Sequence, residues 1–242
     1  MDNADSSGPL YFRQLLMGRD LATRDPVARQ MVNFAYLIGD RARGEAIVVD
    51  PAYAPSELVD LLEADGMRLV GALATHYHAD HVGGDLFGHS IAGVAELLDK
   101  VQVPVHVQRA EVPWVTRTAG IGREDLVEHD GDEVISVGDL EIRTVHTPGH
   151  TPGSQCFLVE GRLVAGDTLF LQGCGRTDLP GSDPAAMYDS LVNRLARLPD
   201  EVVVYPGHLY SAEASATLGE TKRWNPVLAP RSAAEWLALF GG

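Results

Sequence analysis

The segment from His76 to His81 constrains the fold of this chain more than any other, because it places three histidines and an aspartate within six residues. It follows residues 69–74, whose length and apolar composition predict a buried strand. Side chains alternate between the two sides of an extended chain, so His76 and His78 face the same way and can bind one ion together. Asp80 and His81 come where the chain turns and can face a second ion. Imidazole and carboxylate groups suit zinc and iron, so we predict a site for one or two metal ions.

A cluster of neighbouring residues cannot surround an ion alone, so further ligands are expected from other parts of the chain. Three ligand-type side chains stand next to glycine just beyond predicted strands: His150 after 140–145, Asp167 after 162–165 and His208 after 201–205. Glycine lets the backbone turn sharply and come close to a site. Each residue taken singly is compatible with an ordinary turn, but the three together predict that the site draws ligands from several strand ends.

Outside these positions the sequence alternates short strands and hairpins with helices, in two halves. In the first half, a hairpin over 31–49 precedes a helix that begins at Ser56. In the second half, hairpins over 133–145 and 155–165 precede a helix that is capped by Asp183. We predict an α+β fold in which two sheets pack face to face with helices outside them.

Two segments are expected to stand apart from this core. Residues 1–10 are mostly small and polar and are expected to form a flexible N-terminus, which leaves 11–242 as a single domain. The stretch between Gly84 and Val101 is expected to form a flap beside the site. His89 within it is expected to be a loop residue rather than a ligand.

Charge and composition exclude several classes of partner. Lys and Arg total 19 and Asp and Glu total 34, which gives a formal charge of −15. A negative field repels phosphate backbones, so no nucleic-acid partner is expected, although metal ions can reverse the sign locally. No apolar run approaches the roughly 18 residues that span a bilayer, and the N-terminus has no signal-peptide pattern, so a cytoplasmic protein without a membrane partner is expected. The only two cysteines, Cys156 and Cys174, form no disulfide framework.

The order and spacing of the ligand-type residues resemble the metallo-β-lactamase superfamily, over about residues 31–230. The motif that carries the resemblance is His76-x-His78-x-Asp80-His81, followed in order by His150, Asp167 and His208. The resemblance implies a four-layer αβ/βα sandwich with the metals at one edge between the sheets. It implies two ion sites, the first held by His76, His78 and His150, the second by Asp80, His81 and His208, with Asp167 bridging both.

Within that superfamily the chain is most similar to the branch that contains glyoxalase II and the persulfide dioxygenases. The similarity rests on three stretches, 173–178 (Gly-Cys-Gly-Arg-Thr-Asp), 208–210 (His-Leu-Tyr) and 218–226 (Leu-Gly-Glu-Thr-Lys-Arg-Trp-Asn-Pro). It implies hydrolysis of a thioester such as a hydroxyacyl-glutathione by a metal-bound hydroxide, with two divalent ions, zinc in preference to iron. The alternative that it implies is an iron-dependent persulfide dioxygenase that oxidises glutathione persulfide, with the iron held by His76, His150 and Asp167.

For the hydrolase, the resemblance implies that Asp80 is the catalytic residue, which orients the hydroxide and also binds the second ion. Arg176 and Tyr210 stand beside ligands in the sequence and are expected to bind the substrate, a small molecule derived from a thiol. Cys174 is expected to be structural, and a homodimer is compatible with these features. Only 18 residues follow Trp224, fewer than the helical glutathione-binding domain of glyoxalase II requires.

Overall fold

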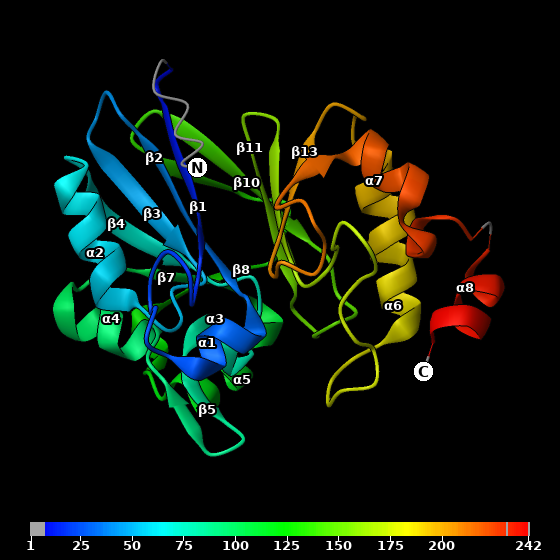
Figure 1. The fold of residues 1–242 in the computed structure, drawn as a ribbon, viewed down its shortest axis with the longest axis horizontal. Helices are drawn as coiled ribbons and strands as arrows, with labels where there is room; N and C mark the ends of the chain where they lie inside the picture. Colours follow the sequence, from blue (N-terminus) through cyan, green and yellow to red (C-terminus); the bar gives the residue numbers. More distant parts are fainter. Residues whose placement is uncertain (1–7, 231, 242) are drawn as a thin grey trace.

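Two six-stranded sheets lie face to face, and helices cover the outer side of each (Figure 1). The structure is a computed structural model, and it describes residues 8–230 and 232–241. The predicted α+β sandwich with αβ/βα layers is therefore confirmed. Residues 1–7 of the expected flexible N-terminus lie outside the described residues, and the first strand begins at Leu10.

The first sheet is built from the N-terminal half of the chain. Its strands lie in the order β1 (Leu10–Leu16), β2 (Phe34–Asp40), β3 (Glu45–Val49), β4 (Arg68–Leu73), β7 (Val105–Gln108) and β8 (Leu126–His129). The first two pairs are antiparallel, and the pairs from β3 to β8 are parallel. The helices that pack on its outer face are α2 (Pro55–Ala64), α4 (Val94–Lys100) and α5 (Val112–Ala119). Parallel strands bring their carboxyl ends to one edge, which is where β4 delivers the histidine cluster.

The second sheet comes from the C-terminal half. Its strands lie in the order β14 (Ala216–Thr217), β13 (Val203–Pro206), β12 (Arg162–Gly166), β11 (Gln155–Val159), β10 (Leu140–His146) and β9 (Val134–Val137). Its outer helices are α6 (Pro184–Tyr188), which continues as the π-helical η3 (Asp189–Arg194), α7 (Leu218–Trp224) and α8 (Ala233–Phe240). Asp183 caps α6 as predicted, because its carboxylate accepts hydrogen bonds from the backbone of Ala185 and Ala186.

Besides the apolar cores beneath the outer helices of each sheet, a third core fills the space between the two sheets. Strand β2 contributes Tyr36 and Ile38, and the opposite sheet contributes Ile142 and Phe157, all of them buried. The Tyr36 hydroxyl also donates a hydrogen bond to the carbonyl of Pro206, which joins β2 to β13 across the sandwich. This core fixes the separation of the sheets, so side chains at the shared edge are held at a defined distance from one another.

The segment between Gly84 and Val101, predicted as a flap, divides into two parts. Its first part is a small hairpin of β5 (Gly84–Leu86) and β6 (His89–Ile91), and its second part is helix α4 in the outer layer. The hairpin follows the short helix α3 (Ala79–Val82), and helix α1 (Pro26–Met31) lies near it (Figure 1). Short 3₁₀ turns complete the chain at η1 (Arg109–Glu111), η2 (Arg123–Asp125), η4 (Leu195–Arg197) and η5 (Pro226–Leu228).

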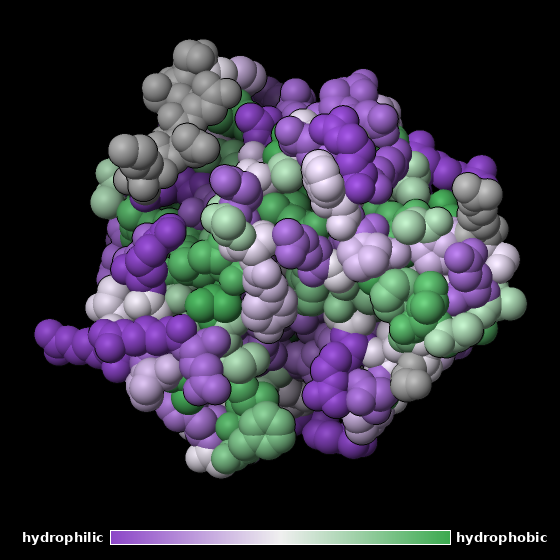
Figure 2. All heavy atoms as spheres, turned by 45° about the vertical axis from the view of Figure 1, so that its right-hand side comes forward, coloured by the Kyte–Doolittle hydropathy of each residue, from purple (hydrophilic) through white to green (hydrophobic). Residues whose placement is uncertain are grey.

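The surface is mixed in character. Figure 2 shows apolar side chains in separate patches among hydrophilic ones on one face. Within residues 8–230 and 232–241, none of the helices combines the length and the apolar character that crossing a bilayer demands.

Candidate metal centre

The seven predicted ligand residues meet at one edge between the two sheets. Each follows the carboxyl end of a strand, with His76, His78, Asp80 and His81 after β4, His150 after β10, Asp167 after β12 and His208 after β13. All but His78 and Asp167 are buried, and these two are largely covered. Each sheet thus supplies part of the cluster, so the site exists only when the two halves of the chain are folded together.

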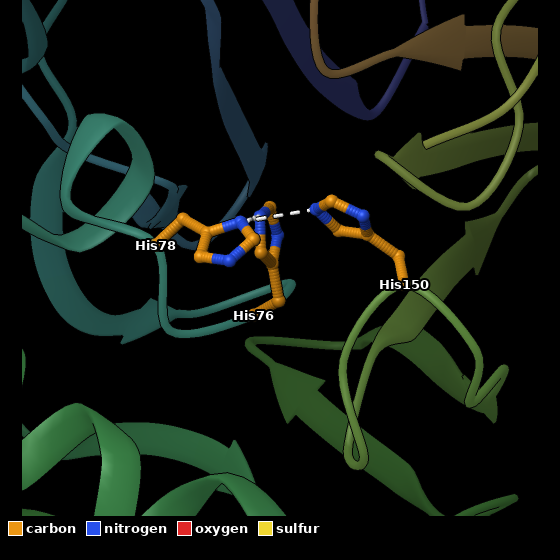
Figure 3. A group of neighbouring side chains, drawn as sticks. All are labelled: His76, His78 and His150. Carbon is orange, nitrogen blue, oxygen red and sulfur yellow. Dashed lines mark hydrogen bonds between the residues drawn. The ribbon is translucent and has the colours of Figure 1, made fainter. Parts of the chain in front are cut away.

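The first group of candidate ligands is formed by three imidazoles. His76 and His78 come from the first sheet, and His150 reaches toward them from the second (Figure 3). The Nδ1 atom of His78 lies 3.0 Å from Nε2 of His76 and 3.0 Å from Nε2 of His150. Three nitrogen atoms this close together surround a point that a cation can occupy.

The second group consists of Asp80, His81 and His208. The two Nε2 atoms of His81 and His208 lie 3.2 Å apart. The Oδ2 atom of Asp80 is 3.7 Å from the first of them and 3.5 Å from the second. Two nitrogens and one carboxylate oxygen again converge, which fits a second divalent cation.

Asp167 lies between the two groups. Its Oδ2 atom is 3.7 Å from Nε2 of His150 and 3.3 Å from Nε2 of His208. Its Oδ1 atom is buried and lies 3.4 Å from Nε2 of His81, but it accepts no hydrogen bond from the described residues. A buried carboxylate oxygen without a hydrogen bond is costly unless a cation satisfies it, so this observation fits a bridging ligand.

Glycine allows the close approach that this edge requires. A Cβ atom on Gly207 would lie 2.3 Å from Oδ1 of Asp167. A Cβ atom on Gly175 would lie 2.3 Å from the carbonyl oxygen of Asp167 and 2.7 Å from Nδ1 of His150. Any side chain at these two positions would displace a candidate ligand, as the sequence pattern predicted for glycine beside the site.

The outward nitrogens of the histidines are paired with acceptors around the cluster. Three of the rings donate from Nδ1: His150 to the carbonyl of Arg176 at 2.8 Å, His208 to the carbonyl of Met31 at 2.7 Å and His81 to Oδ2 of Asp50 at 2.9 Å. Because these acceptors hold a proton on Nδ1, Nε2 is the nitrogen of each ring that faces the centre and is available to bind a metal once it is deprotonated.

Asp50 is a supporting residue that the sequence reasoning did not single out. Besides His81, its carboxylate accepts hydrogen bonds from the backbone nitrogen of Thr75 at 2.8 Å and from the Thr75 hydroxyl at 2.6 Å. That hydroxyl lies 3.0 Å from Nδ1 of His76. Asp50 therefore orients His81 of the second group directly and His76 of the first group through Thr75. It follows the predicted strand 46–49 but stands between Val49 and Pro51, so the pattern of a ligand-type residue beside glycine does not include it.

Asn33 is the second residue that the sequence reasoning missed. Its Nδ2 atom donates to Oδ2 of Asp80 at 3.1 Å and lies 3.4 Å from Nε2 of both His81 and His208. The amide therefore borders all three members of the second group. Asn33 reaches this place because its backbone forms an isolated bridge with that of His208, a contact with no signal in the local sequence.

Burial and charge act in opposite directions on the two groups. Burial lowers the pKa of His76 well below its ordinary range and lowers the pKa of His78 to about 4, so both rings are neutral and able to bind a metal. Burial opposes the charging of His81 as well, but Asp167 and Asp80, with Asp50, raise its pKa to about 10. The second group thus holds a proton where a metal ion would otherwise supply positive charge.

A cavity of about 640 Å³ opens onto the candidate ligands. Tyr210 lies on its wall, and its ring stacks on that of His208 with centroids 4.7 Å apart and planes 8° from parallel. Arg176 also lines the cavity, and its guanidinium forms two hydrogen bonds of 2.8 Å with the carboxylate of Asp178. The two residues predicted to bind substrate therefore both line the cavity, but the charge of Arg176 is already paired.

The remaining histidines and cysteines lie outside the ligand cluster. His89, in β6, contacts Oδ2 of Asp25 at 3.3 Å. His106 and His129 contact each other at 2.9 Å. Cys174 lines the cavity, and burial raises the pKa of its thiol to about 12, which keeps it protonated and unreactive. Both cysteines are free.

The chain belongs to the metallo-beta-lactamase superfamily, whose family model matches residues 29–208. Among relatives it resembles the human mitochondrial persulfide dioxygenase ETHE1, with 31% identity over 240 residues, which cover 98% of this chain and 82% of that protein. It also resembles a hydroxyacylglutathione hydrolase of Rhodopseudomonas palustris, with 40% identity over 183 residues, covering 74% of this chain and 64% of that protein.

The solved structures agree with this placement. The crystal structure of ETHE1 from Myxococcus xanthus superposes with a TM-score of 0.75 and 30% identity, covering 96% of this chain and 90% of that chain. The predicted membership of the glyoxalase II and persulfide dioxygenase branch is therefore confirmed. The relatives include both a persulfide dioxygenase and a hydroxyacylglutathione hydrolase, so similarity alone does not distinguish these two activities.

Proposed function

We propose that this protein is a metal-dependent thioester hydrolase of the glyoxalase II-like type. The observation that carries the proposal is the position of Asp167, whose carboxylate lies within 3.7 Å of the first group and 3.3 Å of the second. A bridging carboxylate between two complete ligand groups is the arrangement of a site for two divalent ions, of which zinc suits the nitrogen and oxygen donors best. When bound, such ions lower the pKa of a coordinated water and polarise a carbonyl group.

The side chains around the ions would do the remaining chemistry. Burial disfavours the charged form of Asp80, but His81 and His208 lower its pKa, so it stays ionised. Because the Asn33 amide holds its Oδ2 atom, the Asp80 carboxylate is fixed in place to orient the attacking water. Burial, followed by the nearby carboxylates, raises the pKa of Tyr210 above its ordinary value, so its hydroxyl remains a hydrogen-bond donor to the substrate at the cavity wall.

A second candidate function is persulfide oxidation by a single iron ion. The match to human persulfide dioxygenase ETHE1 over 98% of this chain favours it. It would use only His76, His150 and Asp167, a set of two histidines and one carboxylate that leaves open positions on iron for dioxygen and the persulfide. The two candidates therefore differ in whether the second group, Asp80, His81 and His208, is needed for turnover.

One pair of variants separates the candidates. Thiol release from acyl thioesters and oxygen uptake with glutathione persulfide would be measured for the wild type, His76→Ala and His208→Ala. A dinuclear hydrolase should lose thioesterase activity in both variants, by more than the roughly 100-fold cost of removing an outer-shell partner. His89→Ala serves as control, because that imidazole lies outside the cluster. Full thioesterase activity in His208→Ala would refute the proposal, and oxygen uptake that needs His76 but not His208 would replace it with the dioxygenase.

A further inference from the structure

The tip of the β5–β6 hairpin has a side chain that the fold does not explain. Leu86 pairs with His89, so the turn consists of Phe87 and Gly88 alone. Both have positive φ, 53° for Phe87 and 85° for Gly88. Two-residue turns of this kind favour Asn-Gly, and a bulky side chain in the left-handed region is strained. The Phe87 side chain is also fully exposed, at 101% of its reference area. An exposed aromatic side chain on a strained backbone position points to a function.

The base of this hairpin is held firmly. A Cβ atom on Gly84 would lie 2.3 Å from the carbonyl oxygen of Thr118 in α5, so the two backbones are in close contact. A Cβ atom on Gly93 would lie 2.2 Å from the carbonyl oxygen of Val82 in α3. The hairpin is thus packed against the helix that carries Asp80 and His81, and its tip projects from the body of the protein (Figure 1). Phe87 is therefore presented at a fixed place beside the metal centre.

Phe87 and Leu86 line the same cavity as the candidate metal ligands. The other large apolar and aromatic side chains of that cavity are Met31, Tyr77, Phe170, Leu179 and Tyr210. Apart from the candidate ligands, the charged residues among the described lining are Asp85 and Arg176, and Arg176 is already paired with Asp178. A peptide thiol with two carboxylates would find little positive charge here, whereas an aliphatic or aromatic group would find several apolar partners.

We propose that Phe87 and Leu86 form one wall of a subsite for an apolar acyl group. This inference rests on the proposed thioester hydrolysis. The substrate would be a thioester whose acyl part is aliphatic or aromatic. In the reaction, the oxygen of water forms a bond to the carbonyl carbon, the carbon–sulfur bond breaks, and the leaving sulfur takes up a proton to give a free thiol and a carboxylic acid. The bound acyl group covers the Phe87 ring, which accounts for an aromatic side chain left exposed without it.

The variant Phe87→Asn tests this subsite, because asparagine suits the turn better than phenylalanine does. Its melting temperature should equal or exceed that of the wild type. Thioesters of one small thiol, N-acetylcysteamine, would be compared with acetyl, octanoyl and phenylacetyl groups. The wild type should prefer the two larger groups. Phe87→Asn should lower kcat/KM for them about tenfold, which corresponds to about 1.4 kcal/mol, and should change it less than twofold for acetyl. Phe87→Leu should fall between.

The controls separate failure of the subsite from failure of the proposed function. Leu239→Ala removes an apolar side chain that is 63% exposed on α8, outside the cavity, and should change neither activity nor selectivity. Equal loss for all three acyl groups, or a lower melting temperature in Phe87→Asn, would overturn the subsite. If no thioester is cleaved, the proposed function fails. The subsite is then tested by measuring the affinity for methyl octyl ketone by calorimetry. The affinity should be about tenfold weaker in Phe87→Asn than in the wild type, and equal affinities would count against the subsite.

Discussion

Asp50→Asn is the perturbation that most specifically tests how the cluster is organised. Asp50 accepts three hydrogen bonds, from Thr75 N at 2.8 Å, from Thr75 Oγ1 at 2.6 Å and from Nδ1 of His81 at 2.9 Å. An amide has one oxygen in place of two, so at least one donor loses its acceptor: Thr75 N in one orientation of the new side chain, and both Thr75 Oγ1 and His81 Nδ1 in the other. Asparagine tolerates the positive φ of 52° at this position, so the backbone should be retained.

The expected cost follows from the bond that is lost. A hydrogen bond to a charged group contributes about 1.5–3 kcal/mol. If His81 loses its acceptor, nothing holds its remaining proton on Nδ1 when the ring gives up the other one, so the tautomer that binds a metal through Nε2 is less favoured. The affinity of the second group should then fall by about 10- to 100-fold, which is also the usual effect of removing an outer-shell partner. His76 is oriented through Thr75, so the first group should weaken by a smaller factor.

Zinc titration into metal-free protein with a competing chelator measures both affinities. Asp139→Asn is the matched control, since this carboxylate is exposed and its ion pair among the described residues is with Arg43 at the surface. It should bind zinc as the wild type does. Circular dichroism would show that both variants are folded. Equal affinities in Asp50→Asn and Asp139→Asn would refute the role assigned to Asp50.

Two further predictions concern protons. The carboxylates raise the pKa of His81 to about 10 against its burial, so metal binding at the second group should release a proton and tighten about tenfold per pH unit between pH 6 and 8. Binding at the first group should change little with pH, because the pKa of His78 is about 4. Calorimetry in buffers of different ionisation enthalpy measures the proton release, and equal pH dependence at both groups would contradict the prediction. Burial raises the pKa of Glu111 from 4.5 to about 7. A raised folded-state pKa adds stability that is complete below the unfolded value and is lost as the pH rises through the folded one, so the free energy of unfolding should fall by about 3 kcal/mol between pH 4.5 and 8. Glu111→Gln should remove this fall in urea unfolding, and an unchanged pH profile in that variant would show that another group causes it.

The candidate ligands were predictable because their signal is local. A histidine or aspartate beside glycine, immediately after a buried strand, is visible in the sequence, and the sandwich brings those strand ends together. Asp50 and Asn33 were not predicted, because their roles depend on contacts between distant parts of the chain. Asp50 reaches His81 across neighbouring parallel strands, β3 and β4. Asn33 meets His208 at a bridge between residues 175 positions apart.

Strand β1 shows the same limit in the fold. Its buried residues do not alternate, since Tyr11 and Phe12 are both buried, as are Leu15 and Leu16. Tyr11 and Leu15 enter the core beneath the outer helices, while Phe12 and Leu16 enter the core between the sheets. A strand covered on both faces loses the alternation that identifies a half-exposed strand, so the sequence pattern gave no clear signal before residue 31.

The most direct test of the central proposal is the metal content of protein purified without chelators, with activity measured on the same sample. The bridging position of Asp167 between two complete groups predicts two zinc ions per chain together with thiol release from acyl thioesters. One iron ion per chain, with oxygen uptake on glutathione persulfide and no cleavage of thioesters, would contradict it.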